Sequence, residues 1–370
     1  MEIESKVVLT DASRLIIEGL ARAGADSFIG YPITPANLLY YYASKRFSFM
    51  MPAPDEITTM QWMSGLSASG RLPVTATSFP GFALMIESVN MAFMMELPMV
   101  IVLAQRLGPA TGTATCGAQG DLSLLHGMIS GGHQIPVICI SDFYDAWTLA
   151  AEAVRTAVRL RTPVVLLTSK EMVMTHRSFN LSELENIKKV KVKEYNKEAP
   201  YKPYQPEKNL VPPFLHAGND KHQVRITAST HDMSGILQHS TEEALANTIR
   251  LDKKSAENIE EFIHFDYFYE QKAETIVVTY GITAAAATEA CEMADDERIK
   301  VSLLVAKTLL PVPKLYYDFL SRYKRVVFCE ENLNAQFARI IYGDRLPSHV
   351  SHVGAIGKMI SPEDILKALK

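Results

Sequence analysis

The chain has 370 residues and a net charge of −4, with 48% hydrophobic and 21% charged residues. This length and composition are typical of a globular protein with room for two domains. Proteins that bind nucleic acids rely on clustered Lys and Arg, so a mildly acidic chain gives no reason to expect a nucleic acid partner.

The sequence also predicts no association with a membrane. Its first five residues, MEIES, have neither the basic nor the apolar region of a secretory signal. The longest apolar stretch, residues 91–104, is interrupted by Glu96 and Pro98 and is too short to span a bilayer. We therefore expect a cytoplasmic protein.

Four cysteines are scattered along the chain, and no two of them form a Cys-x-x-Cys pair. This spacing encodes neither a zinc site nor a local iron–sulfur motif, so we expect reduced thiols. An iron–sulfur cluster that worked with this protein would have to be held by another chain. The four cysteines are Cys116, Cys139, Cys291 and Cys329.

Short apolar runs alternate with helical patterns in the first half of the chain. Residues 10–24 predict a capped helix with Leu15, Ile16 and Leu20 on its apolar face, and a strand follows from residue 27. Such alternation implies right-handed βαβ units and a parallel sheet. Further strands are predicted at residues 74–77, 99–103, 137–140 and 164–168, and further helices at residues 55–69, 82–95 and 145–159.

The middle of the chain loses this rhythm. Residues 188–208 are rich in charge with scattered Pro and Tyr, and turn signals follow at residues 211–213 and 218–220. We interpret residues 177–270 as an irregular connecting segment, and its lysines as a solvated face.

The alternating pattern returns from residue 275. Ser361 followed by Pro362 is a typical helix start, with Ser as the cap and Pro at the first helical position. We therefore predict two α/β domains, at residues 1–176 and 271–370, on either side of the connecting segment. Strands are predicted at residues 275–279, 301–305 and 325–328, and helices at residues 283–293 and 313–322.

Three stretches of the first domain carry a resemblance to a known family. Residues 30–35 read GYPITP, residues 54–57 read PDEI, and residues 105–112 read QRLGPATG, with QGD at residues 119–121. Together they resemble the α subunit of the 2-oxoacid:ferredoxin oxidoreductases. These thiamine diphosphate-dependent enzymes act on pyruvate, 2-oxoglutarate or branched-chain 2-oxoacids.

The resemblance implies a fold. Residues 1–176 would form a pyrimidine-type thiamine-diphosphate-binding domain with a parallel sheet. Residues 271–370 would form an α/β domain like the C-terminal domain of transketolase.

The resemblance also implies a reaction shared between chains. The α subunit acts only with a β subunit, which supplies Mg²⁺ through a Gly-Asp-Gly motif and carries a 4Fe–4S cluster. No Gly-Asp-Gly occurs in this chain. The complex converts a 2-oxoacid and coenzyme A to acyl-CoA and CO₂ while reducing ferredoxin. Its assembly would be a dimer of heterodimers with an α–α contact, with γ and δ subunits as further partners.

Glu56 corresponds to the family's carboxylate beside the aminopyrimidine ring of thiamine. That carboxylate bonds a ring nitrogen and so activates the cofactor, which does the difficult chemistry. The alternative for an acidic pair at residues 55–56 is that it merely favours a helix N-terminus. With the neighbouring motifs present, we predict the catalytic role.

Two further residues correspond to substrate contacts, and the turn around one of them would touch the cofactor. Thr34 would offer a hydroxyl to the 2-oxoacid, and Arg106 would pair with its carboxylate through a planar fork. Tyr31, Pro32 and Ile33 would line the cofactor site. The alternatives are a turn threonine bonded to local backbone and a surface arginine.

The sequence departs from the family pattern at two positions. Phe79 and Leu107 stand where relatives tend to carry glycine, which adds apolar bulk. These changes either narrow the pocket, redirect it to another 2-oxoacid, or only repack its wall. They make a noncatalytic scaffold one open alternative. The other is a non-redox thiamine-dependent decarboxylase or transketolase-like subunit, which a partner chain without cysteine ligands would indicate.

Overall fold

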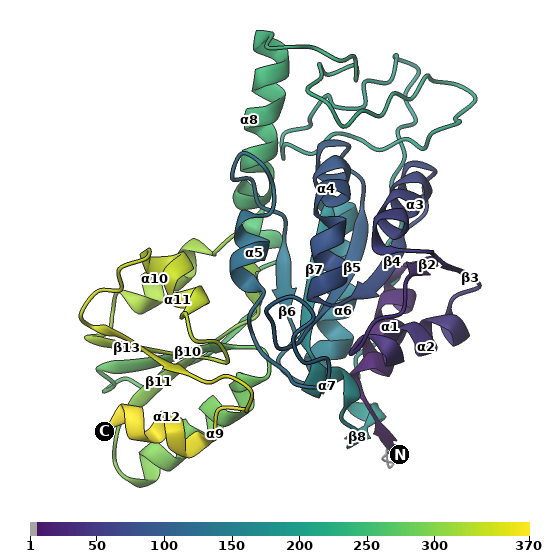
Figure 1. Cartoon of the computed structure of the whole chain (residues 1–370). Helices are drawn as coiled ribbons and strands as arrows, with labels where there is room; N and C mark the ends of the chain where they lie inside the picture. The colour runs from purple at the N-terminus through teal and green to yellow at the C-terminus, as the bar shows by residue number, and fades with distance from the viewer. Residues whose placement is uncertain (1–5) are drawn as a thin grey trace, which may run out of the picture.

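The computed structural model describes residues 6–370, which form two main β-sheets with helices on both faces (Figure 1). This architecture confirms the predicted α/β class with parallel sheets. No helix among the described residues is long and apolar enough to cross a membrane.

The first sheet has seven strands in the order β12-β6-β7-β5-β4-β2-β3. Its neighbours are parallel except β12, which pairs antiparallel with β6. The strands are β2 (Ser27–Gly30), β3 (Phe49–Pro52), β4 (Pro73–Thr77), β5 (Met99–Gln105), β6 (Val137–Cys139), β7 (Pro163–Ser169) and β12 (Thr308–Leu310).

Alternate side chains of this sheet pack into two separate cores, as strands buried on both faces require. One core is shared with α1 (Ala12–Ala23), α2 (Asn37–Arg46), α6 (Phe143–Leu160) and α7 (Lys170–Met174). The other is shared with α3 (Glu56–Ala68), α4 (Phe79–Met94) and α5 (Leu122–Gly127).

The second sheet has five strands in the order β14-β13-β10-β11-β9, and only β9 is antiparallel to its neighbour. Helices α9 and α12 pack on one face, while α10 and α11 pack on the other and join the core beside α3 and α4. The elements are β9 (Phe265–Phe268), β10 (Thr275–Tyr280), β11 (Val301–Ala306), β13 (Arg325–Glu330), β14 (Val350–Gly354), α9 (Thr283–Asp296), α10 (Lys314–Leu320), α11 (Gln336–Tyr342) and α12 (Pro362–Leu369).

Strand β12 ties the two sheets together, because it follows β11 in the chain but extends the edge of the first sheet. The preceding residue strengthens the junction. Lys307 Nζ lies 2.8 Å from Asp145 on α6 and 2.8 Å from Asp266 on β9.

The segment predicted to be irregular contains more structure than its sequence suggested. It includes α8 (Glu242–Glu257), two 3-10 turns (Leu181–Glu183 and Ile259–Glu261), strand β9, and β8 (Arg177–Asn180) paired antiparallel with β1 (Val7–Thr10). Between β8 and α8 the backbone is otherwise mainly irregular and lies over the ends of α3 and α4 at the top of Figure 1.

A buried ion cluster holds α8 against the first sheet. Glu96, just before β5, is fully buried and binds Arg250 and Lys254 of α8, with 2.7 Å between Lys254 Nζ and Glu96 Oε2. Burial alone would raise the pKa of Glu96, but the charges of Lys254 and Arg250 lower it to about 2. The carboxylate is therefore ionised, and it compensates two cations that would otherwise be buried without a partner.

Candidate active site

The predicted site residues follow the carboxyl ends of neighbouring strands. Thr34 lies after β2, Glu56 begins the helix after β3, and Arg106 lies directly after β5. Gly81, which was not among the predicted residues, lies after β4. In a parallel sheet these ends meet at one edge, where ligands of open α/β folds bind.

Glu56 is the first residue of α3, and its position is fixed by the cap before it. Asp55 accepts a hydrogen bond from Thr58 N at 2.6 Å, which opens the helix and turns Glu56 inward. Glu56 is only 6% exposed. No hydrogen bond to its carboxylate is found among residues 6–370, so the group remains available as an acceptor.

The absence of a side chain at Gly81 lets the Glu56 carboxylate pack directly against the backbone of α4. A Cβ at this position would lie 2.5 Å from Glu56 Oε1 and closer still to Thr77 Oγ1. Gly81 lies in the first turn of α4, so the helix backbone can approach the glutamate closely only without a side chain.

The structure brings Arg106 and Thr34 into direct contact. Arg106 Nη1 donates to the backbone oxygen of Thr34 at 2.6 Å, although 72 residues separate them. The Thr34 hydroxyl accepts from Asn37 Nδ2 at 2.9 Å, which leaves its own hydrogen to donate. Arg106 is 5% exposed, and its Nε has no hydrogen-bond partner.

Arg106 also lacks a counter-ion. No carboxylate of the described chain lies within 4 Å of its guanidinium. Burial lowers the pKa of Arg106, and the charge of Asp121 only partly opposes this effect. The result is a buried cation that presents unused donors.

Asp121 lies beside the candidate site, although sequence reasoning did not select it. It is 4% exposed, and its Oδ2 has no hydrogen-bond partner. Burial raises the pKa of Asp121 to about 7, although the charge of Arg106 lowers it. The QGD sequence marked this stretch in the resemblance, but nothing in it indicated a buried acid.

Gln119 fixes the loop that carries Asp121 against the second sheet. Its Nε2 donates to Tyr280 O at 2.7 Å, and its Oε1 accepts from Thr283 Oγ1 and from Glu331 N. Asn332 Nδ2 donates to the Gln119 backbone oxygen. The two sheets therefore meet directly behind the site.

The three residues predicted to contact the cofactor differ in their exposure to solvent. Tyr31 is 41% exposed, Pro32 is also exposed, and Ile33 packs against the core that α1 and α6 share. Phe79 and Leu107 line a cavity of about 320 Å³, with Asp121 at its wall and residues after β13 opposite. The two bulky substitutions thus face open space next to the site.

No group of three or more His, Cys, Asp or Glu that could hold a metal ion is found between residues 6 and 370. All four cysteines are unbridged, and burial raises the pKa of Cys139, Cys291 and Cys329. This donor set does not fit Mg²⁺ or an iron–sulfur cluster, whereas a buried carboxylate without a partner fits a heterocyclic ring nitrogen.

Residues 18–249 match the family model described as pyruvate flavodoxin/ferredoxin oxidoreductase, thiamine diphosphate-binding. The chain is 27% identical to the 2-oxoglutarate synthase subunit KorA of Methanocaldococcus jannaschii, a match that covers 98% of this chain and 99% of that protein. It is 29% identical to the 2-oxoglutarate oxidoreductase subunit KorA of Mycobacterium tuberculosis, over 88% of this chain but only 50% of that one.

Solved structures show the same likeness. The 2-oxoglutarate:ferredoxin oxidoreductase of Magnetococcus marinus, solved with 2-oxoglutarate, coenzyme A and succinyl-CoA bound, superposes with a TM-score of 0.92 at 25% identity. The match covers 99% of this chain and 65% of that chain. A split-gene transketolase, at a TM-score of 0.54 and 15% identity, shares the fold alone. With nearly two thirds of its length inside the family model, the chain belongs to the pyruvate flavodoxin/ferredoxin oxidoreductase family with its thiamine diphosphate-binding domain.

Proposed function

We propose that the chain is the α subunit of a thiamine diphosphate-dependent 2-oxoacid:ferredoxin oxidoreductase and is active only with a separate β subunit. The complex decarboxylates a 2-oxoacid oxidatively to acyl-CoA and CO₂ and reduces ferredoxin. Family membership and the names of the relatives support this assignment.

The observation that carries the proposal is the buried guanidinium of Arg106, which has no carboxylate within 4 Å among residues 6–370. A buried charge normally has a partner, because removing an ion from water costs several kcal/mol. A 2-oxoacid carboxylate would provide that partner and match the planar fork of the guanidinium. Its contribution is orientation, because the carboxylate charge is lost as CO₂ leaves.

Glu56 would hold the cofactor ring. Thiamine diphosphate, when bound, supplies a nucleophilic carbon and an electron sink for decarboxylation. The Glu56 carboxylate would accept a hydrogen bond from a pyrimidine nitrogen, and its burial keeps water from competing for that bond. The close approach at Gly81 would fix the carboxylate in this position.

The turn after β2 would complete this chain's share of the pocket. The free hydrogen of the Thr34 hydroxyl would donate to an oxygen of the 2-oxoacid, next to Arg106. Tyr31, Pro32 and Ile33 would contact the cofactor. The exposure of Tyr31 and Pro32 is consistent with a site that a second chain closes.

The partner chains would supply what this chain lacks. We assign Mg²⁺ and the 4Fe–4S cluster to the β subunit, with ferredoxin and coenzyme A as substrates of the complex. The assembly would be a dimer of heterodimers with an α–α contact and with γ and δ subunits, located in the cytoplasm. Residues 1–176 would be the thiamine-binding domain, residues 177–270 the connecting segment and residues 271–370 the transketolase C-terminal-like domain.

A reconstituted complex tests this function. The chain is co-purified with its β partner, and dye reduction that depends on a 2-oxoacid is measured for wild type, for Glu56→Gln and for Glu289→Gln. The control Glu289 is an exposed glutamate on α9 without an ion pair among the described residues. We expect Glu56→Gln to lose at least a hundredfold in rate and the control to retain it. Equal rates for wild type and Glu56→Gln would show that the assigned role of Glu56 is wrong.

The same complex separates the two alternatives. A non-redox decarboxylase or transketolase-like subunit would release CO₂ without reducing the dye. A noncatalytic scaffold would bind its partner and turn over no member of a 2-oxoacid panel. In that case replacing Phe79 and Leu107 with glycine, the residue that relatives tend to carry there, would be the next variant to measure.

A further inference from the structure

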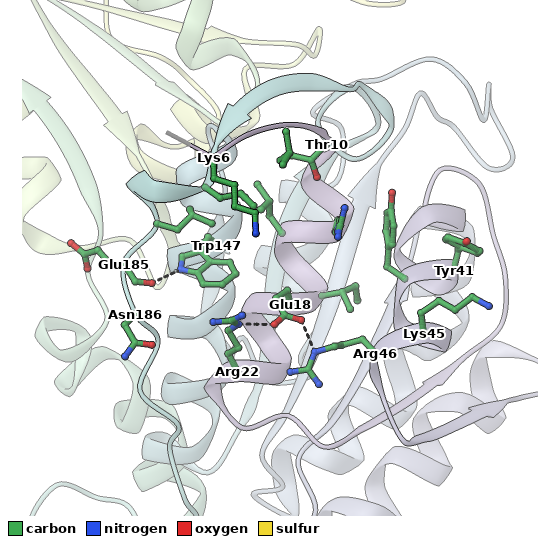
Figure 2. Close-up of a pocket in the computed structure, with 17 residues that line it drawn as sticks. Lys6, Thr10, Glu18, Arg22, Tyr41, Lys45, Arg46, Trp147, Glu185 and Asn186 are labelled. Carbon is green, nitrogen blue, oxygen red and sulfur yellow. Dashed lines mark hydrogen bonds and ion pairs between the residues drawn. The ribbon is translucent and has the colours of Figure 1, made fainter. Parts of the chain in front are cut away.

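A groove with a volume of about 780 Å³ lies on the face of the first sheet that α1, α2 and α6 cover (Figure 2). Its apolar wall includes Ile17, Trp147 and Leu184. Trp147 is held in place, because its Nε1 donates to Glu185 O at 2.8 Å. The size and the rigid wall are typical of a site that receives a ligand or a protein segment.

Cations surround this apolar wall, although the chain as a whole is acidic. Arg22 and Arg46 share Glu18, at 2.6 Å and 2.5 Å, in the arrangement that Figure 2 shows. Five cationic side chains line the groove against two carboxylates. Within residues 6–370, the cations Lys6, Arg14 and Lys45 have no carboxylate within 4 Å. The groove therefore favours a negatively charged occupant.

A two-stranded ribbon of β1 and β8 adjoins the groove. Lys6, Val8 and Thr10 face the groove, while Val7 and Leu9 point the other way and are 59% and 69% exposed. A two-stranded ribbon is marginally stable alone in water, and each of its strands has one unpaired edge. Such an edge can accept a further strand from another chain.

The relatives differ in how much of their length this chain matches. The match spans 99% of the Methanocaldococcus jannaschii protein but 50% of the Mycobacterium tuberculosis protein and 65% of the solved Magnetococcus marinus chain. The longer relatives therefore carry an additional part. In a longer relative, the additional part would cover some surface of the shared fold. A chain that lacks this part exposes the same surface, unless a separate protein covers it.

We infer that the groove and the β1–β8 ribbon form the docking surface for a separate protein chain, the counterpart of the additional part of the longer relatives. This partner inserts carboxylates beside apolar side chains into the groove. The inference rests on the proposed multi-subunit assembly but not on its chemistry.

The position of the groove separates this partner from the β subunit. Glu56 lies on α3, and α3 and α4 pack on the opposite face of the sheet from α1 and α6. Ile57, Trp62 and Leu84 on that face are 45%, 38% and 54% exposed, and we expect the chain that completes the thiamine site to approach from this side. The inferred partner would therefore bind the face opposite to that of Glu56.

Cross-linking of the purified native complex tests the inference. A reagent that joins amines directly to carboxylates is applied, and peptides linked to Lys6 or Lys45 are sequenced by mass spectrometry. We expect links to Asp or Glu of a chain that aligns with the part of the Mycobacterium tuberculosis relative outside the present match. Links to a second copy of this chain, links to the β subunit, or no link to such a third chain would overturn the inference.

Charge reversal gives an independent readout. In the complex carrying Arg14→Glu together with Lys45→Glu, we expect at least tenfold less of the third chain to be retained, with the β subunit still bound. The control Lys272→Glu changes an exposed lysine of the second-sheet region and should retain both. Full retention of the third chain by the double variant contradicts the inference. If the double variant misfolds, the wild-type cross-links still decide. Dye reduction is measured in parallel, so a failure of the proposed function is seen separately.

Discussion

Arg106→Gln is the variant that tests the reasoning about the active site most directly. The guanidinium is buried, makes one hydrogen bond at 2.6 Å to the Thr34 backbone oxygen, and leaves its Nε without a partner. Glutamine keeps an amide donor in the same direction but removes the charge and the fork. Arg106→Lys keeps the charge and removes only the fork.

The expected magnitude follows from the bonds that a carboxylate would form. A hydrogen bond to a charged group contributes about 1.5–3 kcal/mol. Arg106→Gln removes the two hydrogen bonds of a bidentate pair with the carboxylate, and the glutamine amide replaces part of one, so the net loss is about 3–4 kcal/mol. At about 1.4 kcal/mol per tenfold, kcat/KM should fall by a factor of roughly 10² to 10³. Most of the loss should appear in KM, because the pair forms in the bound ground state and its charge is gone when CO₂ leaves. For Arg106→Lys we expect a loss of about tenfold.

The assay is the initial rate of dye reduction by the reconstituted complex at saturating coenzyme A, with the 2-oxoacid varied. Arg345→Gln serves as the matched control, because Arg345 is exposed and makes no hydrogen bond or ion pair among the described residues. The free enzyme should not lose stability in Arg106→Gln, since the variant removes a buried cation without a counter-ion. An unchanged KM with a normal kcat would refute the assignment of Arg106 to the substrate carboxylate.

Three further outcomes follow from the contacts. Gly81→Ala should reduce dye reduction about as strongly as Glu56→Gln while its unfolding transition stays cooperative, because the added Cβ displaces the Glu56 carboxylate; full activity would show that this close approach is unimportant. Burial raises the pKa of Asp121 to about 7. The folded protein therefore keeps a proton on Asp121 that the unfolded chain releases near pH 4. Because of this difference, the free energy of unfolding should fall as the pH rises from about 4 to 7. The Asp121→Asn variant should not show this decline. In urea unfolding at pH 5 and pH 7.5, its free energy of unfolding relative to wild type should rise by a few kcal/mol at the higher pH. Parallel pH profiles of the two proteins would contradict the burial argument. Glu96→Gln should lower the free energy of unfolding in urea by about 3–5 kcal/mol, because it leaves two buried cations unpaired. Adding Lys254→Met should recover part of this loss. If the effects of the two substitutions on the free energy of unfolding simply add, the groups are not coupled.

Local signals predicted most of the secondary structure. The helix expected at residues 55–69 is α3, and the acidic residues at its start are the Asp55 cap and Glu56. The Ser361 cap with Pro362 opens α12 as expected, and Ser361 accepts a hydrogen bond from Asp364 N. These features depend on a few adjacent residues, which a single sequence displays directly.

Contacts between distant residues were not visible in the sequence. Strand β12 has three residues and pairs with β6, about 170 residues earlier, so no local pattern indicated which sheet it would join. Glu96 holds α8 through a hydrogen bond from Arg250, although 154 residues separate the two in the chain. Asp121 follows a glycine in a loop, and only the approach of the second sheet through Gln119 buries it. Burial of this kind depends on tertiary packing, which periodicity does not encode.

The other buried cations of the described chain bear on the proposed role of Arg106. Arg250 and Lys254 share the ionised Glu96. Arg161 lies in the field of the same carboxylate, and its Nη1 donates to three proline carbonyl oxygens. Arg250 and Lys254 are compensated by that carboxylate, as stability requires. Arg161 has no carboxylate within 4 Å among the described residues, and carbonyl oxygens are its hydrogen-bond partners there. Arg106 is buried to a similar degree, yet it has one carbonyl and, within 4 Å, no carboxylate among the described residues. We therefore propose that Arg106, a buried cation with one carbonyl partner at the carboxyl edge of the parallel sheet, is arranged to receive an anion there.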